Sequence, residues 1–405
     1  MSNQKNYIRN KYSESDKQQA HWSGVFAMTL CVFSLIASEF MPVSLLTPMA
    51  QALNVTEGMT GQGIAISGAF AVVTSLFISR LAGTLNRKTL LLGLTCTMAL
   101  SGAIIAIATN YLTYMTGRAL IGIVVGGFWS MSAATAMRLV PVHRVPLALA
   151  IFNSGNALAT VIAAPLGSWL GSVIGWRGAF FCLIPVAFVA LIWQLISLPS
   201  MPGTRQEAGS RNIFTLFRYR LVTLGMLGVG IFFMGQFTLF TYIRPFLEIV
   251  TKVHASVVTI VLLVIGVAGF IGTTLIGRVL KFGFYQTLMV IPVLMAITAL
   301  ALIAFGHQVA FVVVLLGLWG LIATAAPVGW WAWIPRTFPQ NAEAGGGLMV
   351  ATVQLSIALG STVGGLLFDH QGYQSTFLAS ALMLIISTVL IFLTSRADNT
   401  GNPQR

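Results

Sequence analysis

The sequence predicts an all-α membrane protein with twelve transmembrane helices, arranged as two parallel repeats of six. The chain of 405 residues is 57% hydrophobic and 8% charged, whereas a soluble domain carries about 25% charged residues. Its mean hydropathy is +0.88. The apolar residues form continuous runs of the ~20-residue length that crosses a bilayer as a helix. They do not form the ~10-residue alternating segments of an outer-membrane barrel.

Twelve apolar runs are bounded by charged residues or by Gly and Pro, and a polar stretch separates them into two groups of six. The first group comprises 22–45, 58–82, 89–108, 111–137, 145–170 and 177–198. The second comprises 221–248, 256–280, 286–305, 309–333, 345–368 and 374–395. The expected organisation is a tail (1–21), a six-helix bundle (22–198), a linker (199–220), a second six-helix bundle (221–395) and a C-terminal tail (396–405).

The net charge of +13 is distributed unevenly over the loops. Most of the 22 Lys and Arg residues lie in the two tails and in alternate loops, whereas the opposite loops hold only Arg177 and Lys252. Basic loops stay on the cytoplasmic side of a membrane. Topology therefore explains the basic balance without a nucleic-acid partner, and both termini are expected in the cytoplasm.

Several residues recur in the second half at nearly constant spacing. Gly122, Arg138 and Pro141 return as Gly320, Arg336 and Pro339, Arg80 returns as Arg278, the segment at Gly175 returns at Gly372, and Pro42 returns as Pro245. The first four pairs are 198 residues apart, the fifth 197 and the last 203. A shared register predicts parallel repeats that rock against each other around a central site.

These motifs resemble a known family. Arg118-x-x-x-Gly122-x-x-x-Gly126 and the helix break Pro165-x-Gly167, within twelve spans, are similar to the major facilitator superfamily. Two further motifs, Glu39-Phe-x-Pro42 and Tyr242-Ile-x-Pro245, resemble its drug:proton antiporter branch.

Longer stretches, such as EFMPVSLLTPMAQ from Glu39, GGFWSMSA from Gly126 and AAPLGSWLG from Ala163, resemble the bacterial purine ribonucleoside efflux pumps of that branch. The resemblance covers about 22–395. It implies a proton-coupled antiporter of a bacterial inner membrane that exports purine ribonucleosides or related analogues. Sugar or multidrug efflux by the same mechanism is the alternative.

The loop between the second and third spans departs from the family pattern. The superfamily usually has an acid followed by basic residues here, but Gly83 stands at the position of the acid, ahead of Arg87 and Lys88. A latch between helices that depends on that acid cannot be assumed in this chain.

Three ionisable residues, Glu39, Arg118 and Arg244, lie inside the apolar runs, where each costs roughly 2.5–3.5 kcal/mol on insertion scales. Glu39 is expected about seven residues before the end of its run and Arg118 about seven after the start of its own, roughly 10 Å deep. Burial disfavours a charged carboxyl, and a nearby arginine favours it. If a rocking motion changes these surroundings, Glu39 binds a proton in one conformation and releases it in the other, with Arg118 in a coupling role. The alternative is an ion pair, or a hydrogen-bonded Glu39, that only braces the helices.

Arg244 has two interpretations. Glu248 lies one turn later, so an ordinary i, i+4 ion pair accounts for it. Against this, Pro245 removes a backbone hydrogen bond beside it, which favours a role in substrate binding or gating. Pro42 is the counterpart of Pro245 in the first half. Pro165 and Gly167 carry the motif that the resemblance assigns to sealing the outer gate of exporters, although glycine-rich helix packing also explains it.

A nucleoside needs a flat apolar surface for its base and amide or hydroxyl groups for its polar edges. Residues of these types lie in the spans expected to line the centre. They are Phe128, Trp129, Asn153, Asn156, Gln236, Phe237, Phe240, Tyr242, Arg244, Trp330 and Gln354. Spacing places Gln236, Phe240 and Arg244 on one face of a continuous helix. Lipid-facing or core packing for the aromatic rings, and hydrogen bonds between helices for the amides, are the alternatives.

The sequence contains no recognisable motif for nucleotide binding, metalloprotease or serine-hydrolase chemistry. GxxxxGK[ST], HExxH and GxSxG patterns are missing, so we expect no ATP-driven step and no enzyme. The three cysteines lie within apolar runs and the five histidines at helix ends or in loops, so we expect no disulfide framework and no metal. The expected partners are a small-molecule substrate and the lipid bilayer, the expected energy source is the proton gradient without a cofactor, and the expected state is a monomer.

Overall fold

The computed structural model describes residues 20–82, 85–141, 144–202, 218–337 and 342–400, and the regular structure within them is helical. The first half contains α2 (Trp22–Leu53), α3 (Glu57–Ala82), α4 (Arg87–Ala106), α5 (Tyr111–Leu139) and α6 (Val145–Ser197). The second half contains α7 (Arg220–Phe240), α8 (Ile243–Ile249), α9 (Ala255–Phe282), α10 (Phe284–Phe305), α11 (Val309–Ala323), α12 (Ala326–Thr337), α13 (Ala342–Gln371) and α14 (Tyr373–Thr400).

The described helices supply the twelve membrane crossings that the sequence predicts. Eleven stretches are long and apolar enough to cross a membrane. One of them has 51 residues, enough for two spans. The backbone of this stretch leaves helical geometry at Gly175, where φ is 77°. Gly175 is therefore the turn between the fifth and sixth crossings, within α6.

Two crossings that we expected to be single helices are interrupted. The seventh breaks at Thr241 and Tyr242, between α7 and α8, and the tenth breaks at Thr324 and Ala325, between α11 and α12. Pro245 accounts for the first break because it has no N–H to bond the carbonyl of Thr241. Expected helix limits also shift. The first crossing continues to Leu53 rather than ending near residue 45.

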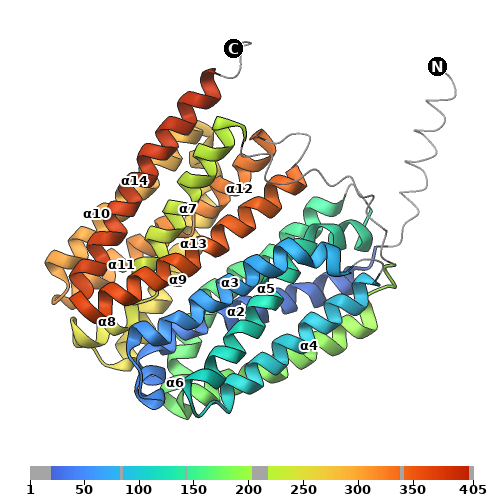
Figure 1. Cartoon of the computed structure of the whole chain (residues 1–405), viewed down its shortest axis with the longest axis horizontal. Coiled ribbons are helices and arrows are strands. Elements are labelled where there is room, and N and C mark those ends of the chain that lie inside the picture. The colour runs from blue at the N-terminus through green and yellow to red at the C-terminus, as the bar shows by residue number, and fades with distance from the viewer. Residues whose placement is uncertain (1–19, 83–84, 142–143, 203–217, 338–341, 401–405) are drawn as a thin grey trace.

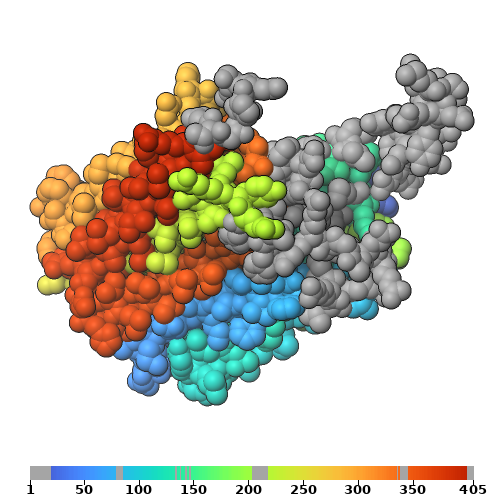
Figure 2. Space-filling model, turned by 45° about the horizontal axis from the view of Figure 1, so that its top comes forward, coloured from blue at the N-terminus to red at the C-terminus, as the bar shows by residue number. Residues whose placement is uncertain are grey.

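The two halves form two groups of helices that lie side by side (Figure 1). Their buried residues form separate cores. One core comprises mainly second-half residues together with Val43 and Ile64, and two smaller cores lie within 25–201. Figure 2 shows α13 of the second half lying along α3 of the first.

Met201 packs in a first-half core, and its N–H donates to Asn86 Oδ1 (3.0 Å), so the start of the predicted linker packs on the first bundle. Most of that linker lies outside the described residues, as does Gly83.

The backbone repeats with the register found in the sequence. Gly122 of α5 lies against the carbonyl of Ser67 in α3, and Gly320 of α11 lies against the carbonyl of Ile265 in α9. Both the glycines and the carbonyls are 198 residues apart. Positive φ angles recur in the same way, at Asn54 and Lys252 and at Gly175 and Gly372. The twofold repeat of the fold is therefore confirmed in its helix contacts and turns.

The halves are joined at one end, which we call the closed end, where α2 and α8 terminate and α3 begins. Thr56, ahead of α3, donates to Asp369 of α13 (2.5 Å), and Thr259 of α9 donates to Ser168 of α6 (2.9 Å). Arg244 of α8 donates to the carbonyl of Ser44 in α2. These bonds fix the two bundles together at this end of the membrane.

The close approach of α5 to α3 gives a test of the packing. A Cβ on Gly126 would lie 2.2 Å from the carbonyl oxygen of Ala71, whereas a Cβ on Gly93 of α4 meets no atom within 4 Å. We expect Gly126→Ala to destabilise the protein by about 1–3 kcal/mol through overpacking, and Gly93→Ala to stabilise it slightly through helix propensity. Thermal unfolding in detergent measures both. Equal melting temperatures for the two variants would contradict the contact.

Candidate functional site

Glu39 lies near the middle of the membrane-spanning part of α2. It is 14 residues before Leu53, the last residue of the helix, so it lies about 21 Å from that end at 1.5 Å per residue. This corrects the depth of roughly 10 Å expected from the sequence, because α2 continues past the end of the apolar run. The residue is only 3% exposed. Gln354 Nε2 of α13 donates to Glu39 Oε1 over 3.3 Å, so the carboxyl group lies at the contact between the halves.

Arg118 is fully buried in α5 and bonds backbone rather than a side-chain carboxylate. Its Nε donates to the carbonyl of Gly63 in α3 (2.9 Å). Its two terminal nitrogens donate to the carbonyls of Ser38 (2.8 Å) and Glu39 (3.0 Å) in α2. The guanidinium therefore ties α2, α3 and α5 together next to Glu39. An ion pair between Arg118 and the Glu39 carboxylate is not among the bonds of the described residues, and the carboxyl group of Glu39 takes its hydrogen bond from the other half.

Aromatic rings from both halves meet next to Glu39 in the chain, at Phe40. Phe40 of α2 stacks on Phe237 of α7 across the two halves, with ring centroids 5.8 Å apart and planes inclined by 28°. Phe237 meets Phe240 edge to face, also at 5.8 Å. Two predicted substrate residues, Phe237 and Phe240, thus contact each other, and Phe40 is a member of the group that sequence reasoning missed.

Two glutamines, the sequence neighbour of Phe237 and the partner of Glu39, have amide oxygens without hydrogen-bond partners. Gln236 Oε1 of α7 and Gln354 Oε1 of α13 are buried, and no described residue donates a hydrogen bond to either. A buried acceptor without a donor costs about 1–3 kcal/mol. A ligand that carries N–H or O–H groups would supply the missing donors.

Asn153 and Asn156 lie on the side of α6 opposite the exposed Leu158, as the helical period requires. Asn153 is exposed and Asn156 half-buried. Asn153 Nδ2 donates to the carbonyl of Leu149 in its own helix (3.0 Å), which leaves its amide oxygen for another partner. The described helix contacts do not bring these amides to Glu39.

Other predicted substrate residues are placed in helix packing. Phe128 is buried in a first-half core, edge to face with the half-buried Trp129 at 6.2 Å. Trp330 is buried in the second-half core against Trp333 at 6.0 Å. Tyr242 donates to the carbonyl of Ser361 (2.8 Å) and stacks on Phe368. Because the seventh crossing breaks at Tyr242, helical spacing no longer places Arg244 on the face of Gln236 and Phe240.

Arg244 forms the expected i, i+4 ion pair and also contacts the first half. Its Nη2 lies 2.8 Å from Glu248 Oε1, which is the i, i+4 ion pair. Its Nη1 donates to the carbonyl of Ser44 in α2 and approaches Ser168 Oγ of α6 at 3.4 Å. The guanidinium therefore joins α8 of the second half to two helices of the first.

The predicted gating residues surround this junction. Pro42 is buried in α2, and Pro245 is buried in α8 next to Arg244. Pro165 lies inside α6, and a Cβ on Gly167 would lie 2.6 Å from Ser44 Oγ. The Pro165-x-Gly167 motif thus lets α6 approach α2 at the carbonyl that receives Arg244.

A second junction at the closed end was not foreseen from the sequence. Asp369, near the end of α13, accepts from the backbone N–H of Gly58 (2.9 Å) and from Thr56 Oγ1. Thr56 Oγ1 also accepts from the N–H of Met59 (3.1 Å). A carboxylate of the second half therefore lies at the positive N-terminus of a first-half helix. Thr56 before an apolar helix signals a helix start, but the sequence does not show which acid reaches it.

Known proteins resemble this chain along nearly its whole length. The family model of the Major Facilitator Superfamily matches residues 28–360 and 287–405. The transcription regulatory protein OpdE of Pseudomonas aeruginosa is 67% identical over 388 residues, which are 95% of this chain and 96% of that protein. The purine ribonucleoside efflux pump NepI of Salmonella enteritidis is 37% identical over 384 residues, with the same shares covered.

Solved structures share the fold at low identity. The nucleoside transporter NupG has a TM-score of 0.72 at 15% identity, over 92% of this chain and 98% of that one. The human organic anion transporter MFSD10 has a TM-score of 0.64 at 17% identity, over 92% of this chain and all of that one. At these identities the likeness concerns the fold.

The three bonds of Arg118 give a test of its role. Lys carries the same charge but has no planar fork, so we expect Arg118→Lys to leave backbone carbonyls of α2 and α3 without donors, at about 1–3 kcal/mol each. Its melting temperature in detergent should fall well below that of wild type. Arg220→Lys, at an exposed position, is the matched control. A full-stability Arg118→Lys variant would show that the fork is dispensable.

Proposed function

The chain belongs to the major facilitator superfamily, and from that premise we propose that it is a proton-coupled antiporter that exports purine ribonucleosides or related purine analogues. In the proposed cycle the two halves rock against each other and expose a central site to one side of the membrane at a time. The proposed direction is outward, and the proton gradient is the energy source. Glu39 is the proposed proton carrier.

The observation that carries this proposal is the position of Glu39. Its carboxyl group is buried at the contact between the halves and is bonded by a neutral amide, Gln354 Nε2. When the halves separate at this point, the carboxyl group loses that bond and gains water. Burial favours the neutral form of a carboxyl group and hydration the charged form, so proton binding depends on which conformation the protein adopts. This dependence is what couples a proton to a conformational cycle.

The structure corresponds to one state of such a cycle. If basic loops lie in the cytoplasm, the closed end faces the periplasm, and the bonds of Arg244 and Asp369 seal the exit. The central residues Glu39, Gln236 and Gln354 then receive substrate from the cytoplasmic side. Opening of the closed end must break the bonds at Ser44 and Gly58 while new contacts form elsewhere.

The proton gradient is sufficient for export of a neutral solute. Exchange of one inward proton for one neutral molecule moves one charge, which at ~100 mV supplies about 2.3 kcal/mol. That energy supports a concentration ratio of roughly 50-fold. A pH gradient adds to it.

The substrate class rests on the chemistry of the central residues and on a relative. Phe40 and Phe237 present aromatic faces, and Gln236 and Gln354 present buried acceptors that match donors on a purine edge or ribose. The name of the 37% identical NepI supports a purine ribonucleoside. Sugars have no aromatic base to stack on these rings, and cationic drugs would use Glu39 as a counter-charge. Counterflow with inosine, a pentose and a cationic dye separates the three classes.

The name of the 67% identical OpdE raises a second possibility, an effect on transcription. The transporter fold offers an indirect route to it. An exporter sets the internal concentration of its solute, and a regulator that binds that solute then changes gene expression. On this basis Glu39→Gln should change transcription as a deletion does. A transport-dead variant that still regulates normally would favour direct action instead.

Glu39→Gln tests the coupling. Gln has the same shape but carries no exchangeable proton, so we expect the concentration ratio of inosine in proteoliposomes with an imposed potential to fall from roughly 50-fold to one. Counterflow of inosine should persist because it needs no net proton movement. Asp398→Asn, which removes an exposed carboxylate of α14 outside the central site, is the control. Accumulation by the wild type that a protonophore leaves unchanged would contradict coupling itself.

Asp369→Asn tests the seal. The change removes a charge at the N-terminus of α3 and weakens a charge-assisted hydrogen bond worth about 1.5–3 kcal/mol. We expect the population with an open exit to rise about tenfold to a hundredfold. Spin labels on Leu112→Cys and Gln308→Cys, exposed at this end of the two halves, report the separation. Asp398→Asn, in α14, should leave the distance distribution unchanged, and an equal shift in both variants would refute the seal.

A further inference from the structure

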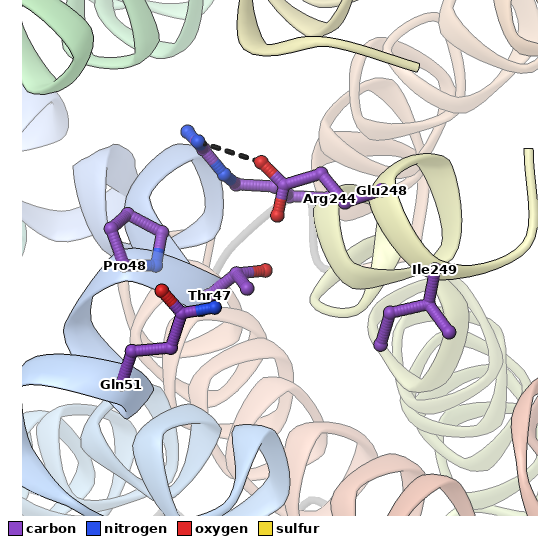
Figure 3. Close-up of a pocket in the computed structure, with 6 residues that line it drawn as sticks. All are labelled: Thr47, Pro48, Gln51, Arg244, Glu248 and Ile249. Carbon is purple, nitrogen blue, oxygen red and sulfur yellow. Dashed lines mark ion pairs between the residues drawn. The ribbon is translucent and has the colours of Figure 1, made fainter. Parts of the chain in front are cut away.

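A pocket of about 360 Å³ lies at the closed end, away from Glu39 and Gln354. It is lined by Thr47, Pro48, Gln51, Arg244, Glu248 and Ile249. Figure 3 shows the side chains of α2 and α8 facing each other across it. Its volume is at the lower end of the ~300–1,000 Å³ range of small-molecule sites. The pocket therefore has room for a solute of the size of a pentose or nucleoside.

The charges of the pocket balance. Arg244 Nη2 and Glu248 Oε1 are 2.8 Å apart and neutralise each other. A charged ligand would leave one of the two ions with a like charge beside it, whereas a neutral ligand keeps the pair intact. The pocket therefore favours a neutral molecule.

Two polar atoms of the pocket lack partners. Thr47 Oγ1 and Arg244 Nε are buried, and no described residue bonds either atom. Their residues are 7% and 5% exposed. In Figure 3 the Thr47 hydroxyl points from α2 toward the α8 side of the pocket, below the Glu248 carboxylate. Buried donors of this kind normally have acceptors, so the pocket is prepared for a polar ligand.

We infer that this pocket is a second binding site, on the exit path, for a neutral molecule that carries hydroxyl groups. The hydroxyl oxygens of this molecule accept hydrogen bonds from Thr47 and from Arg244 Nε–H. Its hydroxyl groups donate hydrogen bonds to Glu248 or to the Gln51 amide oxygen. Pro48 and Ile249 contact its apolar part. The choice of a nucleoside as ligand rests on the proposed function, whereas the preference for a neutral hydroxylated molecule rests on the pocket alone.

Protection of a cysteine from a maleimide tests the site. Ile249→Cys places the thiol in the pocket wall, and Gln308→Cys places one at an exposed position outside it. The exposed Cys96 and Cys182 are replaced by Ser, and buried Cys31 is kept. The full chain in lipid nanodiscs is labelled with increasing inosine or D-ribose. At about ten times the dissociation constant, either probe should slow labelling of Ile249→Cys roughly tenfold and leave that of Gln308→Cys unchanged.

Variants distinguish occupancy of this pocket from a movement caused by the central site. Thr47→Val keeps the shape and removes the hydroxyl, so protection should be lost. Thr47→Ser keeps the hydroxyl and should retain protection, which also controls for folding. Gln236→Leu changes only the central site and should retain it too. Any other pattern overturns the proposal, as does a lack of protection by both probes. Inosine counterflow, measured separately, decides the proposed function: protection without counterflow would refute export and leave the pocket standing.

Discussion

The hydrogen bond from Gln354 to Glu39 is the contact between the two halves on which the proposed coupling depends. A carboxyl group in an apolar interior must be neutral, paired or hydrated, and here its partner belongs to the opposite bundle. Separation of the bundles therefore changes the surroundings of the acid directly, with no intermediate chain of contacts. The stacked rings of Phe40 and Phe237 beside it respond to the same movement, since each half supplies one ring.

Arg118 shows the opposite solution to the same problem. Its guanidinium bonds three backbone carbonyls of α2 and α3, and these helices belong to its own half. Movement between the halves leaves all three bonds in place. The two buried ionisable groups thus differ in what surrounds them. The bonds of Arg118 stay within one half, whereas the carboxyl group of Glu39 is bonded by the other half, so in the proposed cycle the proton of Glu39 follows the movement.

The sequence predicted what depends on local pattern. Apolar runs gave the crossings, the spacing of 198 residues gave the repeat, and the rarity of intramembrane acids singled out Glu39. The breaks at Thr241–Tyr242 and Thr324–Ala325 were missed because a short interruption leaves hydropathy unchanged. Phe40 and Asp369 were missed for another reason. Their importance comes from partners in the other half, and that pairing depends on how the bundles are docked in this conformation. The core positions of Phe128 and Trp330 likewise follow from bundle packing, which hydropathy alone does not resolve.

In the proposed cycle, the Arg244 junction at the closed end has a property that a reversible seal needs. Arg244 holds Ser44 of the first half, and its ion pair with Glu248 lies within one helix of the second half. When the junction opens, the carbonyl of Ser44 loses a donor, but the buried guanidinium keeps its counter-ion. A lone buried charge would cost several kcal/mol, enough to hold the exit shut. The ion pair with Glu248 is therefore compatible with the proposed gating role of Arg244, and in the proposed cycle it makes that role reversible.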